Sequence, residues 1–131
     1  MLSNQGSINT ANTGLGNSGD IEIDVASLVI TAGGRIVSEI FGSGNGGNIN
    51  INAEESISVI GNTELFSFIS ASVGLNGIGE AGNITIETTQ LILQGASVFA
   101  DVIGNGEGGT IDILAVDSIE LSNTSFFQAD V

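Results

Sequence analysis

Carboxylates are the only groups in this sequence that could carry out acid–base or metal chemistry in any number. Its 131 residues include fifteen Asp and Glu, a single basic residue (Arg35), and no His or Cys. Without His and Cys, an imidazole base, a Ser-His-Asp triad and a thiolate metal site are all excluded. Two kinds of chemistry are left: cleavage of a glycosidic bond by two carboxyls roughly 5–10 Å apart, and calcium binding by clustered oxygens.

Two acidic groups are the candidates for such sites. One consists of Asp20, Glu22 and Asp24, and the other of Asp101, Glu107 and Asp112. Polysaccharide lyases and hydrolases combine clustered carboxylates with a basic residue, and Arg35 is the only cation available. The alternative is a solvated acidic surface that keeps a β-rich protein soluble and discourages pairing at sheet edges. We expect no catalytic residue, cofactor site or metal site.

Glycine-rich segments raise two further kinds of site. A phosphate-binding loop needs a Lys after the glycines and a helix behind it, and neither is present. Calcium-binding β-rolls repeat a glycine-rich segment about every nine residues, so that successive turns complete each site. Here the segment returns once in 27–35 residues, and the residue that follows it is Asp20, Asn48, Asn83 or Thr110. A calcium-binding β-roll is the third hypothesis for this chain, after the shaft and the enzyme described below.

The same glycine-rich segments are the sign of an internal repeat. They read GNSGDIEID from Gly16, GNGGNININ from Gly44, GEAGNITIE from Gly79 and GEGGTIDIL from Gly106. Each contains two alternating isoleucines, and seven or eight residues later comes a second alternating apolar pair, as in half-buried strands. The isoleucine pairs are Ile21/Ile23, Ile49/Ile51, Ile84/Ile86 and Ile111/Ile113, and the second pairs are Leu28/Ile30, Ile57/Val59, Leu91/Leu93 and Ile119/Leu121. A third apolar segment, led by Ile8, Ile36, Phe68 and Val98, begins six residues before another glycine.

Three short strands per repeat, with no helical period, predict an all-β fold: a right-handed parallel β-helix (β-solenoid). It would have about four coils of 27–28 residues, beginning near residues 16, 44, 79 and 106, with residues 1–15 as the end of a preceding coil. The glycines supply sharp corners, where positive φ or close backbone approach excludes a Cβ. A β-sandwich would need hairpin turns instead of a 27–28-residue cycle. We expect one solenoid segment over residues 1–131, a fragment of a longer repeat protein.

Stacked coils would line up equivalent residues in columns about 4.8 Å apart. The predicted outward columns are Asp20/Asn48/Asn83/Thr110, Glu22/Asn50/Thr85/Asp112 and Asp24/Asn52/Glu87/Leu114. In none of them are two acids neighbours, and we expect no column to stack two acids. Because like charges stacked across a ladder are destabilising, this arrangement supports the predicted register.

The repeat that begins at Gly44 carries seven extra residues, mostly around residues 61–67 and 75–78. Insertions in a solenoid form loops on one face, which is often the binding face. The candidate contact residues are Glu64, Leu65, Phe66, Leu75 and Ile78. The alternative is a tolerated bulge or a lid over the core.

The segments GNGGNININAEESISVIG and GEAGNITIETTQLILQGASVFADVIGNGEGGTIDI resemble the repeats of large filamentous haemagglutinin-like exoproteins, most closely the cyanobacterial members secreted by the two-partner route. The resemblance covers residues 7–131. It implies an extended fibre that is exported unfolded through an outer-membrane pore and acts in adhesion to glycans or proteins of neighbouring or host cells. No signal peptide or secretion domain of that family is visible, and the repeats have no catalytic motif from which a functional residue could be transferred.

Together these patterns predict a non-catalytic structural or adhesive shaft segment, extracellular or associated with the outer membrane. A carbohydrate-active β-helix, a lyase or hydrolase, is the main alternative. The net charge of −14 argues against nucleic acid and anionic membrane surfaces as partners, and no apolar run is long enough for membrane insertion. Since neither end shows a polar cap, the isolated chain is expected to associate end to end or to be marginally stable.

Overall fold

The computed structural model describes residues 1–3 and 5–129, which form β-strands and no helix. The strands are β1 (Ser7–Asn9), β2 (Ile21–Thr31), β3 (Arg35–Ile40), β4 (Ile49–Ile60), β5 (Ser67–Val73), β6 (Ile78–Glu80), β7 (Ile84–Gln94), β8 (Ala96–Phe99), β9 (Asn105–Glu107), β10 (Ile111–Ser122) and β11 (Phe126–Gln128). Among these residues no helix is long and apolar enough to cross a membrane.

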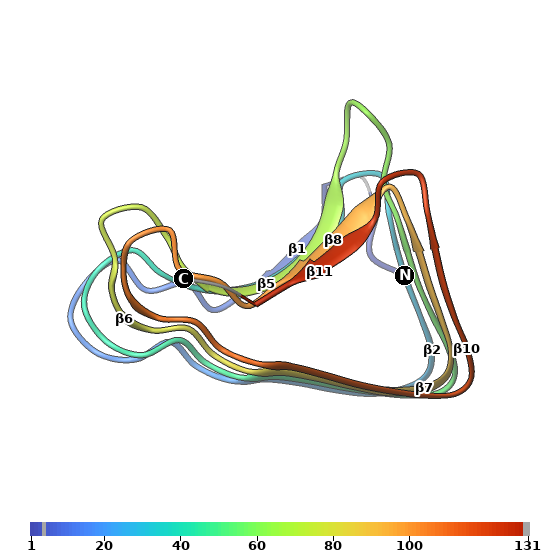
Figure 1. Ribbon diagram of the computed structural model, residues 1–131, viewed down its shortest axis with the longest axis horizontal. Coiled ribbons are helices and arrows are strands. Elements are labelled where there is room, and N and C mark those ends of the chain that lie inside the picture. The colour runs from blue at the N-terminus through green and yellow to red at the C-terminus, as the bar shows by residue number, and fades with distance from the viewer. Residues whose placement is uncertain (4, 130–131) are drawn as a thin grey trace.

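Each strand pairs in parallel with its equivalents on the neighbouring coils, and the chain winds into about four stacked turns (Figure 1). Sheet A contains β2, β4, β7 and β10; sheet B contains β1, β3, β5, β8 and β11; sheet C contains β6 and β9. The predicted all-β parallel solenoid is therefore confirmed. We call the turns that begin at residues 16, 44, 79 and 106 the first to fourth coils.

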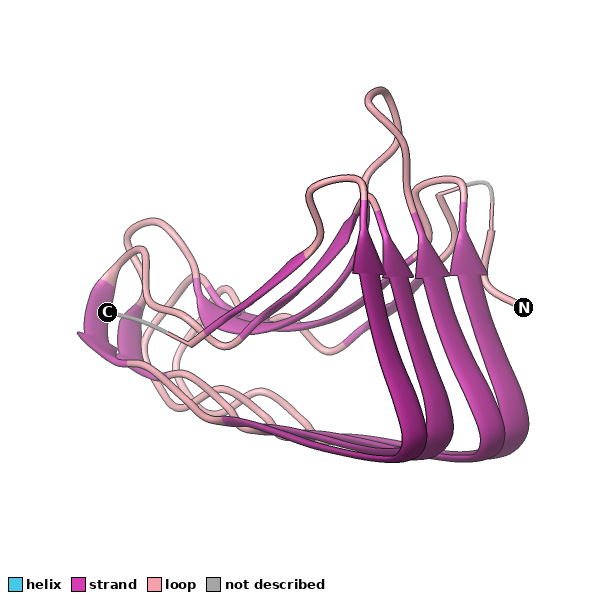
Figure 2. Ribbon diagram, turned by 45° about the vertical axis from the view of Figure 1, so that its right-hand side comes forward, coloured by secondary structure: helices cyan, strands magenta, loops and turns pink. Residues whose placement is uncertain are grey.

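In each strand of sheet A, the first and second predicted strands of a coil are joined. The pairing register shifts once within each strand, for example between Ala53 and Ser56 of β4, and Figure 2 shows these strands bending within their length. A bulge bends a strand while the pairing resumes on both sides of it. At this place β4 and β10 carry one residue more than β2 and β7, and the parallel pairing resumes beyond it, so the sheet turns a corner without losing its ladder.

The paired isoleucine columns of sheet A form one wall of the hydrophobic core, and the inward residues of sheet B form the other. In the interior coils Ile49, Ile84 and Ile86 are fully buried, as are Ile69 and Val98 across the core. Full burial of one such side chain stabilises the fold by roughly 1.5–3 kcal/mol relative to exposure.

The third-strand column differs from the prediction by one residue. Ile36 pairs with Ile69, which is buried in the core, so that Phe68 points to the outer face. Counting six residues back from Gly74 failed because Gly74 takes the position equivalent to Phe41. A Cβ on Gly74 would lie 2.5 Å from Cε1 of the Phe41 ring, so the glycine makes room for that ring.

The corner glycines form two columns, Gly16/Gly44/Gly79/Gly106 and Gly19/Gly47/Gly82/Gly109. In the first column every member has a positive φ, between 113° and 152°. In the second, a Cβ on Gly47, Gly82 or Gly109 would lie 2.0 Å from the carbonyl oxygen of the glycine one coil earlier. The glycines are thus required because the backbones of successive coils stack directly on one another.

Asx side chains beside the corner tie each coil to the next. Asp20 Oδ1 accepts the backbone N–H of Asn48 at 2.7 Å, and Asn48 Oδ1 accepts that of Asn83 at 2.9 Å. Asn83 Oδ1 in turn accepts the N–H of Thr110 at 2.9 Å. These bonds confirm the first predicted outward column and satisfy backbone donors at a place where the strand pairing has not yet begun.

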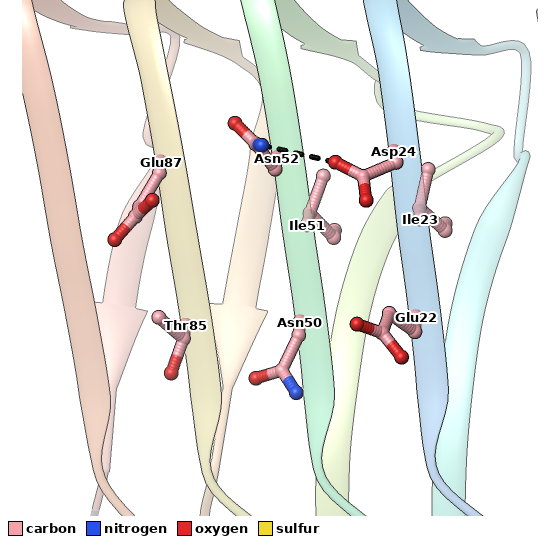
Figure 3. A pocket seen from close by; sticks show the side chains of 8 residues that line it. All are labelled: Glu22, Ile23, Asp24, Asn50, Ile51, Asn52, Thr85 and Glu87. Carbon is pink, nitrogen blue, oxygen red and sulfur yellow. Dashed lines mark hydrogen bonds between the residues drawn. The ribbon is translucent and has the colours of Figure 1, made fainter.

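The other two predicted outward columns are confirmed by the register of sheet A. Asn52 lies between Asp24 and Glu87, and its Nδ2 donates to Asp24 Oδ1 at 2.9 Å (Figure 3). The expectation that no column stacks two acids is wrong in sheet C, where Glu80 pairs with Glu107. Both of these side chains are exposed, so water screens their repulsion.

Replacing a ladder glycine by alanine tests whether coil-to-coil contact requires it. Gly82→Ala should lower the free energy of unfolding by more than about 3 kcal/mol, because its Cβ would lie 2.0 Å from the Gly47 carbonyl oxygen. Gly19→Ala, in the same column of the first coil, should cost less than about 1 kcal/mol, because its Cβ meets nothing closer than Thr10 at 3.9 Å. Chemical denaturation followed by circular dichroism measures both, and equal losses would contradict the steric explanation.

Candidate functional site

The five predicted contact residues fall into two groups at opposite ends of β5. Glu64, Leu65 and Phe66 precede this strand, and Leu75 and Ile78 follow it. All except Leu65 are exposed. The insertion of the second coil therefore does not build one contact surface, and the two groups must be considered separately.

The loop of residues 61–66 projects from the solenoid between β4 and β5 (Figure 1). Asn62 Oδ1 accepts the backbone N–H groups of Glu64 and Leu65, at 2.9 and 2.7 Å, and so holds the loop in a tight turn. Leu65 is half-buried beside Gly33 of the first coil. Phe66 is 65% exposed and lines a groove shared with the third and fourth coils.

This groove has a volume of about 760 Å³ and lies where the coils pass from sheet A to sheet B. The third coil makes this turn with Gly95 alone, whereas the second uses residues 61–66 and the fourth uses residues 123–125. A short turn between two longer ones leaves the space, with Phe66 at one wall and Phe126 at the other. Of these two rings only Phe66 was predicted from the sequence; the signal for the groove is the difference in turn length between adjacent coils.

An aromatic row continues from the groove across the outer face of sheet B. It consists of Arg35, Phe68, Phe99 and Phe126. The Phe126 and Phe99 rings meet edge to face with centroids 5.4 Å apart, and the Phe99 and Phe68 rings do so at 6.3 Å. The Arg35 guanidinium lies 6.0 Å from the Phe68 centroid, within the range of a cation–π contact. The row was not predicted from the sequence, because counting back from Gly74 aligned Phe68 with Ile36 instead of Arg35.

Farther along the same outer face lies a carboxylate–serine cluster of Glu39, Ser70, Ser72 and Asp101. The Ser70 hydroxyl donates to Glu39 Oε1 at 3.4 Å, the two serine oxygens are 2.9 Å apart, and the Ser72 hydroxyl donates to Asp101 Oδ1 at 2.7 Å. Both serines are buried. The chain of hydroxyls connects carboxyls on the first and third coils, an arrangement that could hold a proton between two acids.

Burial raises the pKa of Glu39 above the usual value of a glutamate, and the Asp101 carboxylate adds to this shift. The hydrogen bond from Ser70 and the charge of Arg35 act in the opposite direction but do not cancel it. Desolvation disfavours the ionised form of a carboxyl and is the largest of these causes. Glu39 was not among the acids chosen from the sequence, because only the fold places it near Asp101.

The acids that were chosen do not assemble into the two predicted groups. Glu22 and Asp24 line a shallow depression of about 270 Å³ on the outer face of sheet A, where Asn50 and Asn52 separate them from Glu87 on the third coil (Figure 3). Asp101 belongs to the carboxylate–serine cluster, whereas Glu107 pairs with Glu80 and Asp112 pairs with Thr85. Within residues 1–3 and 5–129, no group of three or more acidic side chains is arranged to hold a metal ion.

No protein-family model, no curated protein and no solved structure matches this chain.

Glu39→Gln is expected to raise the midpoint of thermal unfolding at pH 7. Because the pKa of Glu39 is higher in the folded protein than in the unfolded chain, its ionisation costs stability as the pH rises through the folded pKa. The difference in unfolding midpoint between the variant and the wild type should therefore disappear at pH values below the usual pKa range of a glutamate. Scanning calorimetry across this pH range measures it, with the exposed Glu22→Gln as the control. A lower midpoint for Glu39→Gln at pH 7 would show that Glu39 stabilises the cluster as a carboxylate.

Proposed function

We propose that this chain is a non-catalytic shaft segment of an elongated β-solenoid that acts in adhesion at a cell surface, as in filamentous haemagglutinin-like exoproteins. The observation that carries the proposal is at the fourth coil. Leu91 and Leu93 of the third coil are fully buried, but their equivalents Ile119 and Leu121 are 47% and 46% exposed. The apolar columns of the core are therefore open to solvent at the fourth coil, where stacking of another copy of the chain would bury them.

The mechanism of such a shaft is geometric. Parallel backbone pairing, the Asx column and the glycine columns link each coil to the next, so the segment resists bending as one body. The solvated Asp and Glu side chains on sheet A give neighbouring fibres the same sign of charge, so the fibres repel one another. Loops such as residues 61–66 extend beyond the shaft and are available for contact with cell-surface glycans or proteins.

The two ends of the solenoid differ. At the first coil Leu2 pairs with Ile30, with backbone bonds of 2.8 Å to Val29 and Thr31, and Ile30 is fully buried. Among the described residues both β2 and β10 are outer strands of sheet A, but only the fourth coil leaves the second apolar pair, Ile119 and Leu121, exposed. An unpaired parallel edge with apolar side chains is a template for another chain. We therefore assign the end-to-end contact to the fourth coil.

A carbohydrate-active enzyme is the second candidate, and the carboxylate–serine cluster favours it. A raised glutamate pKa beside a second carboxyl is the arrangement of a general acid. Release of reducing ends from a polysaccharide that is lost in Glu39→Gln and retained in Glu22→Gln would overturn the non-catalytic proposal.

Light scattering over a wide range of protein concentration tests the shaft proposal. We expect concentration-dependent association that Ile119→Lys suppresses, because a charge placed on the exposed apolar column opposes its burial by another coil. Leu75→Lys is the matched control, since Leu75 is 68% exposed on a loop away from the fourth coil. A monodisperse monomer at all concentrations, or equal association of the two variants, would contradict the proposal.

A further inference from the structure

The groove between the projecting loop and the fourth coil has a property unusual for this chain: none of the residues that line it is charged. The protein as a whole carries fifteen acidic residues and a net charge of −14. An anionic ligand would be repelled by the surrounding field, whereas a cationic ligand would find no carboxylate in the groove to pair with. The ligand that fits this charge distribution is neutral.

Two aromatic side chains supply the apolar part of the groove. Phe66 is 65% exposed and Phe126 is 42% exposed, although both are large side chains that proteins usually bury. Phe126 also packs edge to face against Phe99, a contact that restricts its motion before a ligand binds. Rings that are held in place and open to solvent can cover the apolar faces of a ligand at low entropic cost.

The remaining lining is rich in hydrogen-bonding groups. Its polar side chains are Asn62, Thr63, Gln94, Ser97, Asn123 and Thr124. Amides and hydroxyls both donate and accept hydrogen bonds, so they match a ligand whose own hydroxyls do the same. A groove of about 760 Å³ is within the usual size range of small-ligand sites and has room for several sugar units.

The backbone of the fourth-coil wall is strained. Asn123 and Thr124 are consecutive residues with φ of 53° and 63°, in the left-handed region that β-branched residues such as Thr rarely adopt. Strain of this kind is characteristic of ligand clamps. It sets the turn that presents Phe126 across the groove from Phe66.

We propose that this groove binds a neutral oligosaccharide, whose apolar ring faces lie on Phe66 and Phe126 and whose hydroxyls bond to the amides and hydroxyls around them. The proposal rests on the adhesive function proposed above in that it names the ligand class, but the groove itself can be tested alone. The ligand is recognised on the flank of the second to fourth coils, by lining residues that include neither Ile119 nor Leu121.

The experiment is a calorimetric and NMR titration of the whole chain with neutral gluco-, xylo- and manno-oligosaccharides, and with uronic and amino-sugar oligosaccharides of the same length. We expect saturable binding of at least one neutral series, weakened at least about tenfold in Phe66→Ala. Phe41→Ala is the matched control, because Phe41 is 42% exposed but lies outside the groove; its affinity should stay within about twofold of the wild type. Circular dichroism of both variants shows that they are folded.

Three results would overturn the proposal: no binding of any neutral series, binding of the charged series alone, or equal weakening by the two substitutions. A loss of end-to-end association in Phe66→Ala would also overturn it, because the groove would then hold a second copy of the chain. Oligosaccharide binding by a strictly monomeric protein would support the proposed oligosaccharide site and contradict the proposed shaft function. Association without oligosaccharide binding would contradict the oligosaccharide site and support the shaft function.

Discussion

The constraint on which the rest of the structure depends is the parallel backbone ladder between successive coils. Adjacent strands of such a ladder are about 4.8 Å apart. Equivalent residues of successive coils therefore form a column, and each must be able to pack against a residue of the same type. Isoleucine does so inside the core, where Ile49 and Ile84 pair and are fully buried. Glycine does so at the corners, where a Cβ would collide with the coil before it. Asparagine does so outside, by bonding to the N–H of the next coil.

The same ladder determines where variation can occur. Inside sheet A an extra residue is accommodated only at the bulge, as in β4 and β10, whereas the extra residues between β4 and β5 project into solvent as a loop. The neighbouring coil does the opposite and turns with Gly95 alone. A groove results from the contrast between the two turns, not from either of them. Its chemistry then depends on which side chains the adjacent turns happen to place along it.

Charge follows this division between columns and turns. Along sheet A the acids are separated by Asn and Thr, so stacking does not place like charges together. Outside sheet A, acids do come together. Glu80 stacks on Glu107 in solvent, and two buried serines connect Glu39 to Asp101 by hydrogen bonds. The first pair is screened by water. In the second pair burial, and to a smaller extent the Asp101 carboxylate, raises the pKa of Glu39.

The sequence alone determined the fold class, the corners and the register of sheet A, because a repeated pattern forces equivalent residues into contact and short-range periodicity shows which face is buried. It misplaced Phe68 by one position, because residues beside an insertion can no longer be aligned by counting to the next glycine. Only the tertiary structure decided that Phe66 and Phe126 line one groove and that Glu39 is linked to Asp101 through Ser70 and Ser72. The groove depends on how far the turn of each coil extends relative to the turns of its neighbours. The link between the two acids depends on which outward side chains of three successive coils lie together. No local sequence pattern encodes either arrangement.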